Sequence, residues 1–378
     1  MPTIYRADQV GSYLRPNEVL QAHADHAQGT LALEALRTIE DKAILDVIKL
    51  QQEVGIDVIS DGEFRRSGWS SDFQEAVDGY VPGAPPVSLE WHDAGTRPAE
   101  RVEVSMGGAG QGRVIGEKLR PARRITGHES GFVKANAGGR PYKVTMPAAS
   151  YIVTRGYKPG VTDKVYANRK EVLRDVAAII NQEIKDLIAE GVPYIQLDNP
   201  HYPDYVDAGR QAAWKAMGVD PAQSLADDIE ADNACLVGLD RSNVTLGMHL
   251  CRGNGGMGAW HTRGGYDAIA EKVFGLIDVD AFLLEYDSDR AGGFEPLRFV
   301  PKGKVAVLGL ITTKSGALET QDLLAKRIDE ASKFLPLESL TLSPQCGFAS
   351  TLQGNPLTMD EQRKKLELVV STARKVWG

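Results

Sequence analysis

The sequence predicts an α/β fold, a (β/α)8 TIM barrel with a long insertion after the second strand, on the strength of two observations. Short apolar runs recur along the chain, and most are followed by a stretch whose apolar residues have helical spacing. Several runs, including VTLGMHL, AFLLEY and VAVLGL, are almost continuously hydrophobic, which is typical of parallel strands covered by helices. Eight such units fit into 378 residues as one barrel domain, 1–378.

The order of the expected elements follows from these runs. Strands are predicted at residues 4–9, 57–60, 142–146, 194–198, 244–250, 279–286, 305–310 and 340–344. Helices are predicted at residues 31–54, 172–190, 221–239, 266–276, 318–334 and 358–376. A doubly wound open sheet is the alternative, but no G-x-G-x-x-G motif follows an early strand to support a dinucleotide-binding sheet.

Residues 80–141 interrupt this alternation between the second and third strands. The segment is rich in Gly, Pro and Arg, with PGAPP at 82–86 and RPARR at 120–124. A loop of this length is usually functional, disordered or an oligomerisation arm. We therefore expect either a lid or arm, the latter in a homo-oligomer, or a plain surface excursion.

Composition and charge exclude several classes of protein. The net charge is −8 with acids and bases interspersed, so a nucleic-acid binder with a basic face is not expected. No apolar run approaches the roughly 18–20 residues that span a membrane, and the N-terminus lacks the apolar region of a signal peptide. These features predict a cytoplasmic protein. Three cysteines are too few and too scattered for a disulfide framework, and favour metal binding or thiolate chemistry.

Four residues of types that bind metals lie at the ends of predicted strands or just after them. His249 and Cys251 are separated by one residue, so on a strand both side chains point to the same face. Cys346 follows the last predicted strand in SPQCGF, and Glu285 ends the run AFLLE. In a barrel these positions share the carboxyl-terminal rim, where active sites lie. The four side chains are therefore expected to converge, although 95 residues separate the two cysteines.

Two thiolates, an imidazole and a carboxylate form a ligand set that suits zinc. The site would carry a formal charge of about −1, which leaves zinc a mild Lewis acid. If Glu285 is displaced, a substrate thiol can bind as a further sulfur and lose its proton at neutral pH. Asp287 and Asp289 compete with Glu285 as the oxygen ligand, whereas Cys235 in NACLVG is expected to be a small buried hydrophobe.

The sequence resembles the cobalamin-independent methionine synthase superfamily, in particular its short single-barrel branch, and is also similar to epoxyalkane:coenzyme M transferases. The resemblance covers nearly the whole chain and rests on the segments RADQVGSYLRP, QQEVGIDVISDGEFRR, YIQLDNP, MHLCRGN and LSPQCGF. It implies a barrel with zinc on the four ligands named above. It also implies a small, homocysteine-like thiol and an alkyl donor as substrates.

The resemblance further implies three substrate-binding residues. In methionine synthases a Ser of the first G-S motif, a Glu of the G-E motif and an Asp of the Q-x-D motif hold the amino-acid part of the thiol. These fall on Ser12, Glu63 and Asp198. The chemistry agrees, because two carboxylates suit an ammonium group. The structural alternatives are a salt bridge from Glu63 to Arg65 or Arg66, and a helix cap for Asp198.

Two departures from the family leave the donor open. Asn199 stands where methionine synthases have Glu in D-E-P, and Lys314 in GLITTKS stands where they have a catalytic His. The second, N-terminal barrel of the full-length enzymes has no counterpart in this chain. A folate, a corrinoid or other methyl-donor protein, and an epoxide all remain as sources of the alkyl group.

Further candidates follow other predicted strands. Lys314, His201 and Tyr202 are predicted to supply a proton to the reaction. Arg252 and Asn254 follow a zinc ligand directly, and the guanidinium could bind a carboxylate or sulfonate or pair with a nearby Asp. Stacking of the donor on Trp69 and packing of Trp69 against a helix are equally compatible with the sequence.

Three functions are compatible with these residues. The first is zinc-dependent S-methyl transfer to homocysteine or a similar thiol. The second is opening of an epoxide by a zinc-bound thiolate, as in coenzyme M transferases. The third is a non-catalytic zinc-binding barrel that works with a partner protein.

Overall fold

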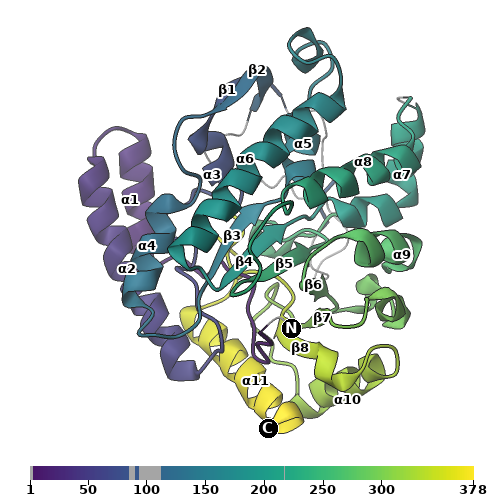
Figure 1. Cartoon of the computed structure of the whole chain (residues 1–378). Helices are drawn as coiled ribbons and strands as arrows, with labels where there is room; N and C mark the ends of the chain where they lie inside the picture. Colours follow the sequence, from purple (N-terminus) through teal and green to yellow (C-terminus); the bar gives the residue numbers. More distant parts are fainter. Residues whose placement is uncertain (1–2, 85–89, 93–111, 217) are drawn as a thin grey trace.

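The computed structural model describes residues 3–84, 90–92, 112–216 and 218–378. At its centre lies a parallel sheet with the strand order β3-β4-β5-β6-β7-β8, enclosed by helices (Figure 1). The strands are β3 (Lys143–Pro147), β4 (Tyr194–Asp198), β5 (Thr245–Leu250), β6 (Ala281–Glu285), β7 (Val305–Ile311) and β8 (Leu340–Pro344). All six predicted strands from 142 onward are thus confirmed, with ends shifted by at most two residues.

The first two predicted strands are reduced to single bridges. Ala7 pairs in parallel with Leu342 of β8, and Ile59 pairs in parallel with Tyr142 just before β3. A full ladder does not form because the carboxylate of Asp57, rather than a backbone carbonyl, accepts the N–H of Ala7 at 2.9 Å. Both edges of the six-stranded sheet therefore continue into the N-terminal segments, as a barrel requires.

The helices alternate with the strands and cover the outside of the sheet (Figure 1). The six predicted helices correspond to α2 (Leu33–Val54), α6 (Arg169–Glu190), α8 (Pro221–Ala234), α9 (Asp267–Leu276), α10 (Gln321–Ser332) and α11 (Met359–Trp377). The described residues also form α1 (Asn17–Ala27), α3 (Ser71–Ala76), α4 (Gly127–Asn136), α5 (Ala149–Gly156) and α7 (Ala208–Ala216).

Local sequence signals explain where the long helices begin and end. Asn168 caps α6 by accepting the N–H of Glu171, and Gly191 ends it in the left-handed conformation at φ 81°. A capping box of Thr358 and Glu361 begins α11. These caps satisfy backbone groups that a helix end would otherwise leave without partners.

The described part of the 80–141 insertion is more regular than its sequence predicts. β1 (Val77–Pro82) and β2 (Arg113–Pro121) form an antiparallel hairpin, and α4 follows it. The hairpin is anchored where Thr162 donates to the carbonyl of Ile115 at 2.6 Å and where the N–H of Leu119 donates to the Tyr166 hydroxyl at 2.9 Å. Residues 85–89 and 93–111 of the insertion lie outside the described residues. Its role as a lid or arm stays a prediction.

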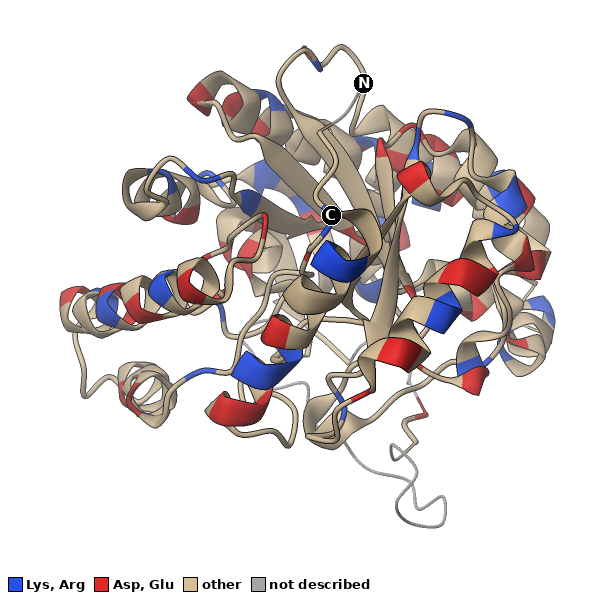
Figure 2. Cartoon of the chain, turned by 90° about the horizontal axis from the view of Figure 1, so that it is seen from below, with Lys and Arg blue, Asp and Glu red and all other residues tan. Residues whose placement is uncertain are grey.

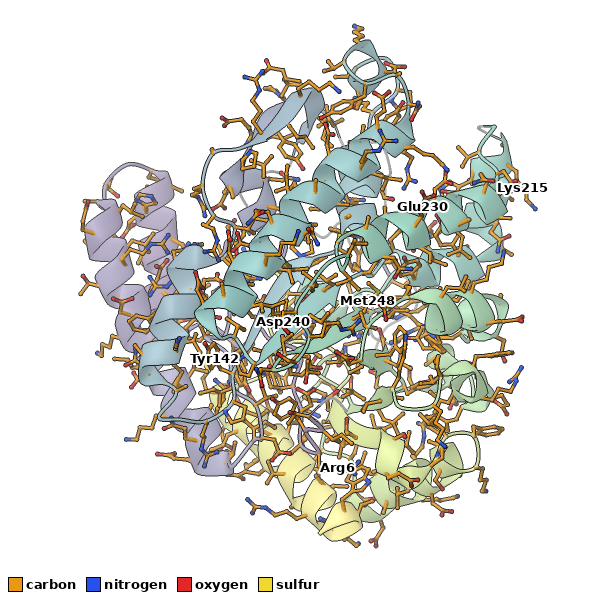
Figure 3. The ribbon with its side chains drawn as sticks, viewed as in Figure 1. Arg6, Tyr142, Lys215, Glu230, Asp240 and Met248 are labelled. Atoms are coloured by element: carbon orange, nitrogen blue, oxygen red, sulfur yellow. The ribbon has the colours of Figure 1, made fainter. Side chains whose placement is uncertain are left out.

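Every residue of the six central strands is buried, as expected for strands covered on both faces. Met248 of β5 lies fully buried near the middle of the molecule, while Lys215 and Glu230 point outward from the helices (Figure 3). The interior also contains a buried ion pair between Lys143 and Asp8, at 2.7 Å.

Acidic and basic residues are intermixed along the outer helices (Figure 2). Among the described residues, no helix combines the length and the hydrophobicity needed to cross a membrane.

Candidate metal centre and substrate pocket

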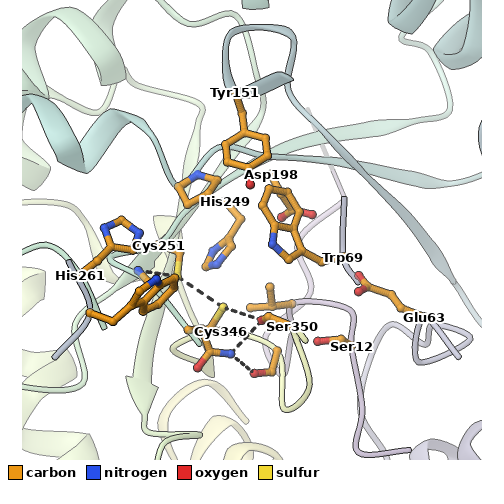
Figure 4. Close-up of a pocket in the computed structure, with 16 residues that line it drawn as sticks. Ser12, Glu63, Trp69, Tyr151, Asp198, His249, Cys251, His261, Cys346 and Ser350 are labelled. Carbon is orange, nitrogen blue, oxygen red and sulfur yellow. Dashed lines mark hydrogen bonds between the residues drawn. The ribbon is translucent and has the colours of Figure 1, made fainter. Parts of the chain in front are cut away.

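A pocket of about 590 Å³, counting the part open to solvent, lies at the carboxyl ends of the central strands (Figure 4). This volume is in the range of pockets that bind small molecules. Its described lining consists of Val10, Ser12, Glu63, Trp69, Trp91, Tyr151, Asp198, Pro200, His249, Cys251, Gly253, Asn254, His261, Cys346, Gly347 and Ser350.

One side of the pocket is formed by His249, Cys251 and Cys346, which we call the His–Cys–Cys group. Their ligand atoms all lie within 4.8 Å of one another, and all three residues are buried. The Cys346 thiol lies 3.6 Å from the sulfur of Cys251, and the N–H of Gly253 donates to Cys251 Sγ at 3.2 Å. Both thiols are free, so the two sulfurs are available as ligands.

The hydrogen bonding of His249 prepares its ring for a cation. Nδ1 lies 3.1 Å from the carbonyl oxygen of Leu283. Because a carbonyl can only accept, Nδ1 carries the proton and Nε2 holds a free lone pair. Nε2 is buried and has no hydrogen-bond partner. A buried acceptor without a partner beside two thiols suits a metal ion, which would take up the free lone pair.

The electrostatics of the two cysteines point the same way. The neighbouring Cys346, burial and the charge of Glu285 together raise the pKa of Cys251 well above its usual range. Two thiolates side by side would repel each other unless a cation lay between them. The residues present therefore fit zinc, which prefers thiolate and imidazole ligands.

Glu285, the fourth predicted ligand, does not belong to the set of atoms within 4.8 Å. Its carboxylate accepts the N–H of Arg252 at 2.5 Å and pairs with Arg290 at 2.6 Å and with Lys314 at 3.4 Å. Burial opposes its ionisation, yet Lys314, Arg290 and Arg252 hold the pKa of Glu285 well below its usual range. The carboxylate is therefore charged but already occupied by cations of the protein. Its role as a zinc ligand stays a prediction.

The three predicted substrate residues lie together in the pocket (Figure 4). Asp198 ends β4, and its Oδ1 accepts a hydrogen bond from Gln196 at 2.8 Å. Burial, opposed by His249, raises the pKa of Asp198 to about 7. Ser12 Oγ accepts the N–H of Ala349 at 3.3 Å, which leaves its own proton free to donate.

Glu63 is held in a strained conformation at the pocket edge. Its φ of 60° lies in the left-handed region, which is uncommon for residues other than glycine. Oε1 accepts the Thr145 hydroxyl at 2.8 Å and lies 3.7 Å from Arg66, whereas Oε2 is buried without a partner. Burial raises the pKa of Glu63 above its ordinary value. Glu63 thus offers an unused acceptor in Oε2, and the predicted alternative of a salt bridge to Arg66 is also present, through Oε1 at 3.7 Å.

Aromatic rings line other parts of the same pocket. The rings of Trp69 and Tyr151 are tilted against each other with centroids 4.6 Å apart. Trp91 meets the edge of His261 at 5.0 Å and an angle of 89°. We call Trp69, Tyr151, Trp91 and His261 the aromatic wall.

Five predicted site residues are absent from the described lining of the pocket, namely Glu285, Arg252, Lys314, His201 and Tyr202. Arg252 is fully buried, and its guanidinium donates to the carbonyls of Gly264 and Glu285. Lys314 faces Glu285, as described above. His201 lies 3.2 Å from Asp204 and 3.3 Å from Asp228, while the Tyr202 hydroxyl donates to Asp232 at 2.8 Å.

Asn254, by contrast, lines the pocket and ties two rim loops together. Its amide donates to the carbonyl of Gly347 and to the hydroxyl of Ser350, both at 2.8 Å. The loop after β5 is thereby fixed to the loop after β8, which positions the two cysteines relative to each other. Cys235 is fully buried away from the pocket, as its apolar surroundings predict.

Trp91, Tyr151, His261 and Ser350 were not identified from the sequence as pocket residues. Tyr151 lies on α5 and the other three lie on irregular segments. Neither periodicity nor a motif distinguishes them from other polar or aromatic surface residues. Only the fold brings them to one rim.

A parallel α/β fold with a His–Cys–Cys group and buried carboxylates at the carboxyl ends of its strands is typical of enzymes, and the group could hold a metal ion. The sequence profile described as the catalytic domain of cobalamin-independent synthase matches residues 5–375. The chain therefore belongs to the cobalamin-independent methionine synthase family, whose members are methyl- or alkyltransferases.

Individual relatives agree with this assignment. The uncharacterized protein YxjH of Bacillus subtilis is 38% identical over 377 residues, covering 99% of this chain and 95% of its own. Methionine synthase of Saccharolobus solfataricus is 24% identical over 371 residues, covering 94% and 95%.

Among solved structures, the putative vitamin-B12 independent methionine synthase of Listeria monocytogenes is 27% identical with a TM-score of 0.74, covering 100% and 99%. A B12-independent methionine synthase from Shewanella sp. W3-18-1, in complex with selenomethionine, has a TM-score of 0.71 at 20% identity, covering 99% and 98%, and so supports the fold.

Proposed function

We propose that this protein is a zinc-dependent methyltransferase or alkyltransferase that acts on the thiol of homocysteine or a similar amino-acid thiol. The observation that carries the proposal is one pocket that combines the His–Cys–Cys group with two buried carboxylates, Glu63 and Asp198. The family uses homocysteine and a methyl donor, and is zinc-dependent in general.

The chain's own residues would hold the amino-acid part of the thiol. The carboxylates of Glu63 and Asp198 suit an ammonium group, because both are buried in the pocket lining and Oε2 of Glu63 has no hydrogen-bond partner. The spare proton of Ser12 suits the substrate carboxylate. With both ends of the amino acid held, the thiol is directed toward Cys251 and Cys346 on the neighbouring side of the pocket.

The ligands for zinc would be His249, Cys251 and Cys346, with Glu285 as the fourth. When bound, zinc lowers the pKa of a thiol that joins the site and so makes a thiolate at neutral pH. Lys314 and Arg290 compete with the metal for the Glu285 carboxylate. This competition makes Glu285 the weakest of the four ligands and the one that a substrate thiol can replace.

Opening of an epoxide by a sulfonate thiol is less well supported. A sulfonate needs a cation, as Arg or Lys provides. Among the described residues that line the pocket there is neither, and the guanidinium of Arg252, the predicted anion binder, is bonded to backbone carbonyls. A purely non-catalytic barrel is also less well supported, since the group lies at the rim where barrel enzymes have their active sites.

The test is a direct comparison of two thiols with the zinc-loaded protein. Binding of homocysteine and of 2-mercaptoethanesulfonate is measured by calorimetry, and their alkylation by mass spectrometry. We expect homocysteine to bind at least about tenfold more tightly, because the described lining carries two carboxylates and neither lysine nor arginine. Asp198→Asn should reduce binding of homocysteine but not of its des-amino analogue 4-mercaptobutanoate. Preference for the sulfonate, or equal effects on both thiols, would contradict the proposal.

A further inference from the structure

We propose that the aromatic wall binds a cationic methyl donor, a sulfonium or quaternary ammonium compound, beside the thiol. This inference rests on the proposed function, because it names the class of the second substrate of the same reaction. Three features of the described residues carry it: the charges of the lining, the position of the rings and the place of Lys314.

The ionisable groups that line the pocket favour cations. Glu63, Asp198 and the two cysteines are acids, and no Lys or Arg belongs to the described part of the lining. An anionic donor would find no counter-charge from lysine or arginine in this lining, whereas a cationic donor meets acids there.

The rings supply the surface on which a methylated cation binds. Trp69 and Tyr151 both line the pocket and lie 4.6 Å apart at an angle of 46°, so their faces form a tilted corner (Figure 4). Trp91 lies fixed against the edge of His261. An onium group within about 6 Å of such rings is attracted by their π faces, and aromatic corners are used to recognise quaternary ammonium ligands.

Lys314 is not placed to protonate a leaving group. Lys314 is 5% exposed, pairs with Glu285 at 3.4 Å and lies outside the described lining of the pocket. A methyl group on a neutral amine, or an epoxide, leaves an anion that needs a proton. A donor that departs as a neutral molecule needs none.

The reaction of an onium donor balances without a further reactant. The thiol loses its proton to solvent, and the thiolate sulfur forms a bond to the methyl carbon. The bond from that carbon to the positive sulfur or nitrogen breaks, and its electron pair stays on the heteroatom. A thiolate and a cation thus give two neutral thioethers, or a thioether and a tertiary amine.

The first experiment measures binding and does not require turnover. Choline is compared with its neutral isostere 3,3-dimethylbutan-1-ol by calorimetry on the zinc-loaded protein. We expect choline to bind about tenfold more tightly, and Trp69→Leu to abolish most of that difference while Trp69→Phe keeps part of it. Trp377→Leu, on the last turn of α11 and outside the pocket lining, is the matched control and should change neither affinity. Equal binding of the two isosteres by the wild-type protein would overturn the inference, even if Trp69→Leu failed to fold.

The second experiment measures methyl transfer to homocysteine from S-methylmethionine, trimethylsulfonium and methyltetrahydrofolate. Transfer from a sulfonium, with thioether released in equal amount, supports the inference. Transfer from the folate alone, with loss of that activity in His261→Gln, would overturn it and assign the proton to His261. Homocysteine binding is followed separately by calorimetry. A protein that binds the thiol but rejects onium donors refutes this inference alone, whereas a protein that binds no thiol refutes the proposed function.

Discussion

Among the residues that the structure describes, two groups of side chains bring metal-type ligand atoms within 4.8 Å of one another, and they differ in whether the protein already supplies a cation. One is the His–Cys–Cys group. The other consists of Asp72, His128 and Glu129. The Arg66 guanidinium lies among these acids and donates to Glu129 at 2.8 and 2.6 Å, with Asp72 at 2.6 Å. We call this second group with its arginine the Arg66 cluster.

The two groups differ in their electrostatics. In the Arg66 cluster burial raises the pKa of Asp72 well above its usual range, whereas Arg66 lowers the pKa of Glu129 to about 2. In the His–Cys–Cys group the nearest acid and the second sulfur raise the pKa of Cys251, and His249 Nε2 has no partner. Close approach of ligand atoms therefore does not define a metal site. A free lone pair and a charge that the protein leaves uncompensated do.

The largest expected effect is loss of the metal and of activity in Cys251→Ser. We expect zinc to fall below stoichiometric content, as measured by plasma emission, and thiol alkylation to fall on the order of a thousandfold. His128→Gln, in the Arg66 cluster, should keep one zinc and full activity. Loss of zinc from His128→Gln would show that the two groups had been assigned the wrong way round.

Removal of the built-in cation should destabilise the fold. Arg66→Met leaves Glu129 and Asp72 buried without their counter-charge, which typically costs about 3–5 kcal/mol. The free energy of unfolding is measured by urea denaturation. Arg363→Met is the matched control, because this exposed arginine pairs with Glu53 and Glu367 and should cost less than about 1 kcal/mol. Equal losses in the two variants would mean that the buried cluster is not held by its arginine.

The free energy of unfolding should depend on pH through Asp61, a buried acid near Arg66 and Glu129. Burial, with the nearby charge of Glu129, raises the pKa of Asp61 to about 7. The folded state therefore holds a proton between about pH 4 and 7 that the unfolded state has released, and stability falls as pH rises through this window. Asp61→Asn should flatten that fall by on the order of 2 kcal/mol in unfolding titrations at pH 5 and pH 8. An unchanged slope would contradict the assignment.

The smallest expected effect is a change in zinc affinity when a cation that pairs with Glu285 is removed. Lys314→Met removes one of the cations that compete for this carboxylate, so zinc should bind a few-fold more tightly. Competition with a chromophoric chelator measures the affinity. Lys326→Met, an exposed lysine that lies 4.0 Å from Glu330, is the control and should leave it unchanged. Weaker zinc binding in Lys314→Met would show that the lysine supports the site.

The sequence predicted the central sheet well because its strands are covered on both faces. A short, continuously apolar run such as that of β6, placed between two helical segments, is typical of a parallel strand covered by helices. The first two strands were predicted too long, since Asp57 takes the N–H of Ala7 through its side chain. A side chain that takes the place of a backbone hydrogen-bond partner leaves no trace in the hydrophobic pattern of the sequence.

The candidate site was predictable only where geometry is local. His249 and Cys251 share a face because side chains alternate along a strand. Cys346 comes just after the carboxyl end of β8, at the same end of the sheet. The destinations of Arg252 and Lys314 were not predictable, because they depend on which carbonyls and carboxylates the other strands present. Of the aromatic wall only Trp69 was a candidate from the sequence. Trp91, Tyr151 and His261 were missed for a similar reason, because they come from separate segments and meet only after folding.

The central claim is that the His–Cys–Cys group holds a zinc ion that accepts a substrate thiol. X-ray absorption at the zinc edge of the purified, zinc-loaded protein, with and without homocysteine, tests this most directly. The expected result is two sulfur neighbours in the free protein and three with homocysteine, at about 2.3 Å. A spectrum with no sulfur neighbours, or one that homocysteine leaves unchanged, would contradict the account.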